Sequence, residues 1–220
     1  MSTGSMSDKK KKIIEMIQKM SGEYSVYQIF DDWISMFAIA IANQVVFNQD
    51  REDAYNQLAQ KHKDKIEKFF ELNGLLIDAM EEGMEDILGY IYMHLELGSS
   101  RTGQFFTPYN ICRLMAQMAL KKTPNEEIYN CNEPSCGAGG NIIAFAEALK
   151  NKGINYQVKM RATCQDIDIR AVYMCYLQCS FYGIPAVVFQ SDTLRDPEGQ
   201  TSTTGKLYTP QFLINMAMWQ

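Results

Sequence analysis

Short segments with strand character alternate with longer segments of helical periodicity between residues 127 and 190, and this alternation restricts the fold more than any other feature. The expected strands are 127–132, 158–165 and 186–190, and the expected helices between them are 141–150 and 168–182. Parallel strands need a long crossover connection, which is usually a helix. The alternation therefore predicts a parallel, doubly wound α/β sheet.

The preceding part of the chain, from about residue 8 to residue 97, has apolar residues at helical spacing. We expect four helices, with apolar faces formed by Ile13, Ile14, Ile17 and Met20; by Trp33, Phe37, Ile41 and Val45; by Ile66, Phe69 and Phe70; and by Ile77, Met80, Met84, Ile87, Leu88 and Ile91. Asn73-Gly74 is expected to end the third helix. The sequence thus predicts a helical region over residues 1–97 and an α/β region over residues 98–220, in which Thr107 as N-cap and Pro108 start a further helix.

Composition and charge exclude several classes of protein. The longest apolar segment, residues 33–47, is interrupted by polar residues and too short to span a bilayer, so we expect no membrane partner. The six cysteines form no Cys-x-x-Cys pair and the chain has only two histidines, so neither a zinc site nor a disulfide framework is expected. Reduced thiols and the lack of a secretory signal pattern predict a cytoplasmic location. With a net charge of −5 and a dense basic cluster only at residues 9–12, the chain is not expected to hold DNA alone.

A glycine-rich turn, Asn132 to Gly140, follows the first expected strand and opens the next helix. Glycine permits positive φ and close approach of the backbone to a ligand, and a helix N-terminus adds free N–H groups. A purely structural tight turn is the alternative interpretation. A dinucleotide-binding fingerprint would require a third glycine where this chain has Ile142, which disfavours a nicotinamide or flavin cofactor.

Acidic residues follow the next two expected strands. Asp166 stands 26 residues after Gly140, close to the place where doubly wound folds put an acid that binds ribose hydroxyls. Asp168 fits a helix-capping role better than a ligand-binding one. Asp192, in Ser191-Asp192-Thr193-Leu194 after the third strand, is a candidate acceptor for an adenine amino group.

The order of these motifs resembles the methylation subunit of type I restriction–modification systems, a family of adenine-N6 DNA methyltransferases. The resemblance rests on Gly103-Gln104-Phe105-Phe106-Thr107-Pro108, Glu133-Pro134-Ser135-Cys136-Gly137-Ala138-Gly139-Gly140, Cys164-Gln165-Asp166 and Ser191-Asp192-Thr193-Leu194. It covers residues 80 to 195 well and the first 80 loosely, with Asp86 to Tyr92 resembling the end of the family's N-terminal region. It implies a Rossmann-like methyltransferase fold, S-adenosylmethionine as cofactor, and DNA as substrate, reached through a specificity subunit.

The resemblance also implies which residues contact the methionine part of the cofactor. The segment from Gln104 to Tyr109, including Phe105, Phe106, Thr107 and Pro108, would touch this part. Glu133, where the family usually has Asp, would face the methionine amino group. The residues Pro134, Ser135, Cys136, Gly137 and Gly139 would form the turn under the cofactor, with Cys136 as a small apolar filler and not a nucleophile.

For the adenosine part, the resemblance gives Asp166 the ribose hydroxyls, although the family often has Glu there. Ile167 would pack on the adenine ring, and Asp192 would bind its amino group. We predict no metal ligand.

One motif of the family is absent. Methyl transfer in this family needs an Asn/Asp-Pro-Pro-aromatic segment that holds the target amino group and stacks on the extruded base. None of the six prolines are adjacent, and the nearest match by position, Thr209-Pro210-Gln211-Phe212, lacks the acid or amide. We therefore assign no catalytic residue, and we expect the cofactor-binding half of a truncated methyltransferase fold, either a fragment or a natural short form.

Three functions stay open from sequence alone. The first is a subunit of an adenine-N6 DNA methyltransferase, and the second is a relative that binds cofactor or a partner without methyl transfer. An unrelated Rossmann-type enzyme is the third, which the glycine spacing disfavours. The chain is also a candidate for forming homo-oligomers. In the family, the fourth strand normally pairs with the free side of the first, and an unpaired strand edge can pair with another chain. The apolar tail from Leu207 to Trp219 is expected to pack either on the sheet or on a second copy of the chain.

Overall fold

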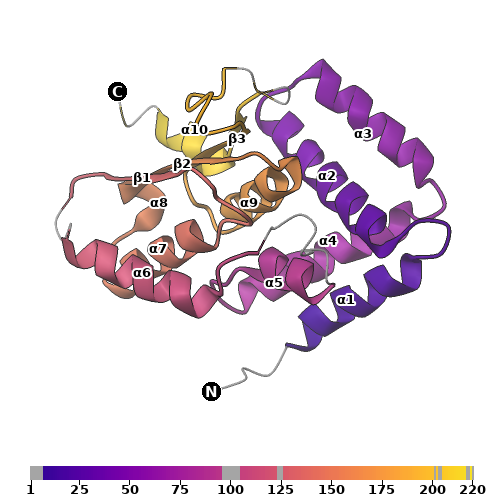
Figure 1. Ribbon diagram of the computed structural model, residues 1–220, viewed down its shortest axis with the longest axis horizontal. Helices are drawn as coiled ribbons and strands as arrows, with labels where there is room; N and C mark the ends of the chain where they lie inside the picture. Colours follow the sequence, from indigo (N-terminus) through magenta and orange to yellow (C-terminus); the bar gives the residue numbers. More distant parts are fainter. Residues whose placement is uncertain are drawn as a thin grey trace.

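The computed structural model describes residues 7–95, 105–122, 126–200, 202, 205–216 and 219. The helical region consists of α1 (Asp8–Met20), α2 (Val26–Val45), α3 (Gln49–Lys61), α4 (Ile66–Glu81) and α5 (Ile87–His94). The α/β region consists of α6 (Tyr109–Lys122), β1 (Tyr129–Glu133), α7 (Gly140–Asn151), α8 (Tyr156–Lys159), β2 (Met160–Asp166), α9 (Ile169–Phe181), β3 (Ala186–Gln190), β4 (Leu207–Tyr208) and α10 (Pro210–Met216). Figure 1 shows α2 of the helical region beside α9 of the α/β region.

The sheet has the strand order β1-β2-β3-β4, with the first three strands parallel and β4 antiparallel to β3. The expected parallel α/β sheet is therefore confirmed, and β3 has the expected bounds. The second strand begins later than expected, because Val158 and Lys159 belong to the short helix α8. Asn155 caps that turn by accepting a hydrogen bond from the backbone N–H of Gln157.

The two faces of the sheet differ in polarity. Along β1 and β2, burial alternates, with Tyr129, Met160 and Ala162 buried and Asn130 and Arg161 exposed. Helices α7 and α9 pack on the sheet and supply most of the apolar residues that bury its first face. On the other face, the Arg161 side chain donates from Nε to Asn130 Oδ1 at 2.9 Å. Strand β3 is buried along nearly its whole length, so the exposed polar residues of the sheet belong to β1 and β2.

One hydrophobic core runs through both regions of the chain. Its largest fully buried side chains include Trp33, Phe30 and Phe69 from the helical region and Tyr176 and Phe189 from the α/β region. The first expected apolar face is confirmed, because the four residues that form it are buried on α1: Ile13, Ile14, Ile17 and Met20.

Two expected helix boundaries are wrong. Asn73-Gly74 lies inside α4, because the Asn73 side chain accepts a hydrogen bond from the buried Trp33 indole at 2.7 Å and stabilises the continuing helix. The expected helix over residues 77–91 is divided, because α4 ends at Glu81 and Asp86 caps a new helix, α5. Helix α3 was not expected, because its exposed surface carries little apolar periodicity.

The C-terminal tail packs on the sheet, as expected, but against β3. Strand β4 pairs with β3 through Val187↔Tyr208 and Val188↔Leu207. The buried Thr209 hydroxyl accepts from the Ala186 N–H and donates to the Ile184 carbonyl, which anchors the return of the chain. Among the described residues β1 has a partner strand on one side only, so it is an edge strand of the sheet. A return to the neighbouring β3 needs less chain than a crossing to β1.

Within the described part of the chain, no helix combines the length and apolar character required to traverse a bilayer.

Candidate functional site

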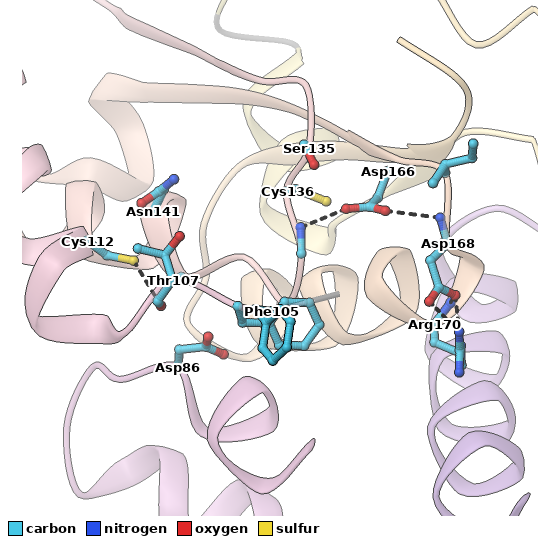
Figure 2. Close-up of a pocket in the computed structure, with 14 residues that line it drawn as sticks. Asp86, Phe105, Thr107, Cys112, Ser135, Cys136, Asn141, Asp166, Asp168 and Arg170 are labelled. Carbon is cyan, nitrogen blue, oxygen red and sulfur yellow. Dashed lines mark hydrogen bonds and ion pairs between the residues drawn. The ribbon is translucent and has the colours of Figure 1, made fainter. Parts of the chain in front are cut away.

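A cavity of about 560 Å³ lies at the carboxyl ends of β1 and β2, where open α/β sheets bind ligands. Its walls come from the glycine loop after β1, the turn after β2, the segment before α6 and the start of α5 (Figure 2). The lining residues are Asp86, Phe105, Phe106, Thr107, Cys112, Ser135, Cys136, Gly137, Gly140, Asn141, Asp166, Ile167, Asp168 and Arg170. The structure thus brings together eight residues assigned from sequence, and their roles toward a ligand remain predictions: Phe105, Phe106, Thr107, Ser135, Cys136, Gly137, Asp166 and Ile167.

The glycine loop needs glycine for both its conformation and its packing. Gly137 and Gly139 have φ values of 53° and 98°, in the left-handed region that other residues rarely adopt. A Cβ atom at Gly137 would lie 2.9 Å from the Phe106 ring, and one at Gly139 would lie 3.1 Å from Cys175 Sγ. The loop is therefore held between the segment before α6 and helix α9.

Asp166 joins the loop to the end of β2. One carboxylate oxygen accepts from the Gly137 N–H at 2.9 Å and the other from the Asp168 N–H at 3.0 Å (Figure 2). Each carboxylate oxygen has a second lone pair, so the group retains capacity for a ligand hydroxyl. The Asp166 side chain therefore fixes the shape of the cavity and can also act as an acceptor within it.

The two residues after Asp166 have different roles. The Ile167 side chain is 69% exposed at the cavity wall, which leaves an apolar surface open to a flat ligand. Asp168 is the N-cap of α9, as expected from sequence, and accepts from the Arg170 N–H at 3.0 Å. The Arg170 guanidinium pairs with the same carboxylate and also contacts the Tyr27 hydroxyl of α2. This contact ties the helical region to the rim of the cavity.

The segment before α6 differs slightly from expectation. Helix α6 begins at Tyr109, and the Pro108 carbonyl accepts from the Cys112 N–H, so Pro108 and not Thr107 occupies the N-cap position. The Thr107 side chain is therefore free to line the cavity, whereas Pro108 is absent from its lining. Phe106 packs between the glycine loop and Tyr92, with ring centroids 5.1 Å apart. Gln104, also assigned from sequence, lies outside the described residues.

Five assigned residues stand outside the cavity lining: Pro108, Glu133, Pro134, Gly139 and Asp192. Glu133 Oε2 accepts from the Asn141 amide at 3.0 Å, and Asn141 itself lines the cavity. The Asp192 side chain accepts from the Leu194 N–H at 3.0 Å in the turn after β3. The Pro134 carbonyl accepts from the Thr193 hydroxyl, so the turns after β1 and β3 are bound to each other.

Sequence reasoning missed Gln165, which organises this edge of the sheet. Its side-chain amide donates to Ser191 Oγ at 3.2 Å and to Thr193 Oγ1 at 2.7 Å. The residue is buried inside a strand, where glutamine gives no sequence signal beyond its poor fit to an apolar segment. Gln165 positions the Asp192 turn next to the glycine loop.

Asp86 was also missed as a site residue. It is the N-cap of α5 and accepts from the Gly89 N–H at 2.9 Å. The Gln178 amide of α9 donates to the same oxygen at 2.8 Å. Burial raises the pKa of this carboxyl, which is 6% exposed. The available signal was an aspartate directly before the apolar residues Ile87 and Leu88, which is typical of an N-cap.

The six cysteines are free thiols, and five of them are buried. Among the described residues no group of three or more histidine, cysteine, aspartate or glutamate side chains is arranged to hold a metal ion. Cys136 is 6% exposed in the glycine loop, with its sulfur facing the interior near Cys175.

Comparisons with known families and solved structures relate this chain to methyltransferases. The sequence profile of N-6 DNA methylases matches residues 80–212, which include every cavity-lining segment. No curated protein matches the chain. A putative class I S-adenosylmethionine-dependent methyltransferase from Listeria monocytogenes has a TM-score of 0.52 and 12% identity, over 97% of this chain and 70% of that chain. The type I restriction-modification methyltransferase subunit from Streptococcus thermophilus has a TM-score of 0.44 and 16% identity, over 87% of this chain and 40% of that chain.

Proposed function

This chain belongs to the N-6 DNA methylase family, and from that premise we propose that its cavity at the carboxyl ends of β1 and β2 binds S-adenosylmethionine. The observation that carries the proposal is the hydrogen bond from the Gly137 N–H to the Asp166 carboxylate. This bond holds a hydrogen-bond acceptor and a glycine turn side by side in the wall of one cavity. A volume of about 560 Å³ suits a ligand of this size. The methyltransferase fold, shared with the Listeria protein, supports the same assignment.

The proposed roles follow the cavity wall. Asp166 accepts hydrogen bonds from the ribose hydroxyls, and Ile167 offers its exposed surface to the adenine ring. Thr107, at the start of the segment leading into α6, donates to the methionine carboxylate. S-adenosylmethionine supplies an electrophilic methyl group, and the residues of this chain bind it and orient it.

Calorimetric titration with S-adenosylmethionine tests this proposal. Replacing Asp166 with Ala removes an acceptor from the cavity, which should weaken binding by about 1–3 kcal/mol. Glu198→Gln removes an exposed carboxylate away from the cavity and serves as the control, with unchanged affinity. If the wild-type chain gives neither heat nor a thermal shift at millimolar cofactor, the proposal is wrong.

We propose DNA adenine as the substrate class and a specificity subunit as the partner that brings the DNA. The net charge of −5 supports DNA binding by a partner subunit, because a protein that binds DNA alone usually presents a basic face. The separate prolines support a second candidate, in which these 220 residues bind the cofactor and do not transfer the methyl group by themselves.

A tritiated methyl-transfer assay separates the two candidates. We expect no transfer to unmodified DNA by this chain alone, because the segment that holds and stacks the target base is missing. Transfer above a no-protein control, abolished by Gly137→Trp, would establish activity of the isolated chain. The Gly137→Trp variant is suited to this purpose because its ring would have to displace Phe106 from the cavity wall.

A further inference from the structure

One oxygen of the Asp86 carboxylate has no donor among the described residues. Oδ1 accepts from both the Gly89 N–H and the Gln178 amide, whereas no described side chain or backbone group donates to Oδ2. The side chain is 6% exposed and lines the cavity. Figure 2 shows Asp86 on a different wall of the cavity from Asp166, near Thr107 and Phe105.

Two glycines keep the space around this oxygen open. A Cβ atom at Gly89 would lie 2.2 Å from Asp86 Oδ2, and one at Gly140 would lie 3.2 Å from it. Gly140 is the first residue of α7, so its position places the positive end of a helix dipole beside the carboxylate. The packing therefore accommodates a carboxylate oxygen directed into the cavity.

The cationic side chains around Asp86 are engaged with other carboxylates. Lys10 Nζ lies 2.5 Å from Glu85 Oε2, and Arg113 Nε lies 3.0 Å from Glu147 Oε2. Arg170, on the other side of the cavity, pairs with Asp168. A buried carboxylate without a protein cation is costly, and burial raises its pKa accordingly. A cationic group from a ligand would compensate this cost.

We propose that Asp86 binds the ammonium group of the cofactor's methionine moiety. This inference rests on the proposed binding of S-adenosylmethionine, and it replaces the role that the resemblance to known subunits gave to Glu133. The Glu133 carboxylate accepts a hydrogen bond from Asn141 and lies outside the cavity lining. Asp86 lies in the lining together with Thr107, so the two residues can hold the ammonium and carboxylate of one amino acid.

The test uses calorimetry to compare three thioethers, none of which carries the sulfonium charge of S-adenosylmethionine. S-adenosylhomocysteine carries the ammonium and the carboxylate, its decarboxylated form keeps the ammonium alone, and 5′-methylthioadenosine has neither. Asp86→Asn should weaken binding of the first two at least about tenfold, because a charge-assisted hydrogen bond is lost. Binding of 5′-methylthioadenosine should stay within about twofold. Glu133→Gln is the matched control and should leave all three affinities within about twofold.

Three other results would contradict the inference or the proposed cofactor site. An equal loss for all three ligands in Asp86→Asn shows that Asp86 only shapes the cavity and overturns the inference. A loss in Glu133→Gln with unchanged Asp86→Asn returns the role to Glu133. If the wild-type chain binds none of the three, the proposed cofactor site itself fails.

A second variant guards against misfolding of Asp86→Asn. Gly140→Ala adds a methyl group 3.2 Å from Asp86 Oδ2 and 3.3 Å from Cys112 Sγ, at a helical position without positive φ, and its melting temperature checks that the chain still folds. This variant should weaken the binding of S-adenosylhomocysteine several-fold more than the binding of 5′-methylthioadenosine. Equal effects on the two ligands would overturn the inference.

Discussion

The two walls of the cavity are built in different ways. The wall from the α/β region consists of neighbouring residues, Ser135 to Gly137 and Asp166 to Ile167, at the ends of adjacent parallel strands. The wall from the helical region depends on one residue, Asp86, which reaches the cavity because α5 packs against α9. The contiguous residues carry a sequence signature of a ligand site, whereas Asp86 carries only the signature of an N-cap.

The largest effect is expected from removing the side chain that joins the two walls. The fully buried Gln178 amide donates to Asp86 and to the Ala138 carbonyl, and its oxygen accepts from the N–H groups of Ile87 and Leu88. Gln178→Leu should lower the free energy of unfolding by about 3 kcal/mol or more, because several buried groups lose their partners. Thermal unfolding followed by circular dichroism should show a decrease in melting temperature of about 6 °C or more.

Gln190→Leu is the control for this change. Gln190 makes one exposed hydrogen bond, to the Ile167 carbonyl, so its replacement should shift the melting temperature by about 2 °C at most. If both variants melt alike, the two walls are not coupled through Gln178.

The second prediction addresses the α/β wall alone. Gly137→Ala forces a left-handed residue against the Phe106 ring, whereas Gly153→Ala, at φ 73°, meets no atom within 4 Å. Both variants should lose about 1 kcal/mol of stability through backbone strain. Only Gly137→Ala should also weaken the binding of S-adenosylmethionine. Calorimetric titration of the two variants with the cofactor measures this difference. Equal binding by both would mean that Phe106 does not shape the site.

The smallest effect is expected from neutralising Asp31, a carboxyl of the helical region that lies near Asp168 of the α/β region. Burial, with Asp32 and Asp168 nearby, raises the pKa of Asp31 to about 6. Since the folded state then favours the protonated carboxyl, the stability that this group contributes is present below about pH 4 and is lost as pH rises to about 6. Asp31→Asn should therefore raise the melting temperature at pH 7 by about 2–4 °C, after allowance for solvent screening, and leave it unchanged at pH 4.

The exposed Asp53 provides the comparison for Asp31. Asp53→Asn keeps a polar group beside Gln49 and should melt like the wild type at both pH values. A stabilisation of Asp31→Asn that is the same at pH 4 and pH 7 would show that the effect is not electrostatic.

The sequence predicted the parallel strands, the glycine loop and the position of Asp166, because these features depend on local pattern and on the order of elements along the chain. It did not predict that Asn73 continues a helix, because a tertiary hydrogen bond from Trp33 holds this side chain. It did not predict that Asp86 starts a helix, because its N-cap bond to Gly89 lies inside a stretch with the apolar spacing of one longer helix. It did not give Gln165 or Gln178 a role, because their hydrogen-bond partners are 26 to 92 residues distant along the chain. Their positions become informative only once strands and helices are packed.

The open side of β1 has a consequence for hydrogen exchange. Strand β2 is bonded on both sides, by β1 and β3, whereas the described residues bond β1 on one side, and its outer face carries the exposed Asn130. Amide protons of β1 should therefore exchange with solvent faster than those of β2. Because β1 leads directly into the glycine loop, a ligand in the cavity should slow the exchange of β1 amide protons more than that of β2 amide protons.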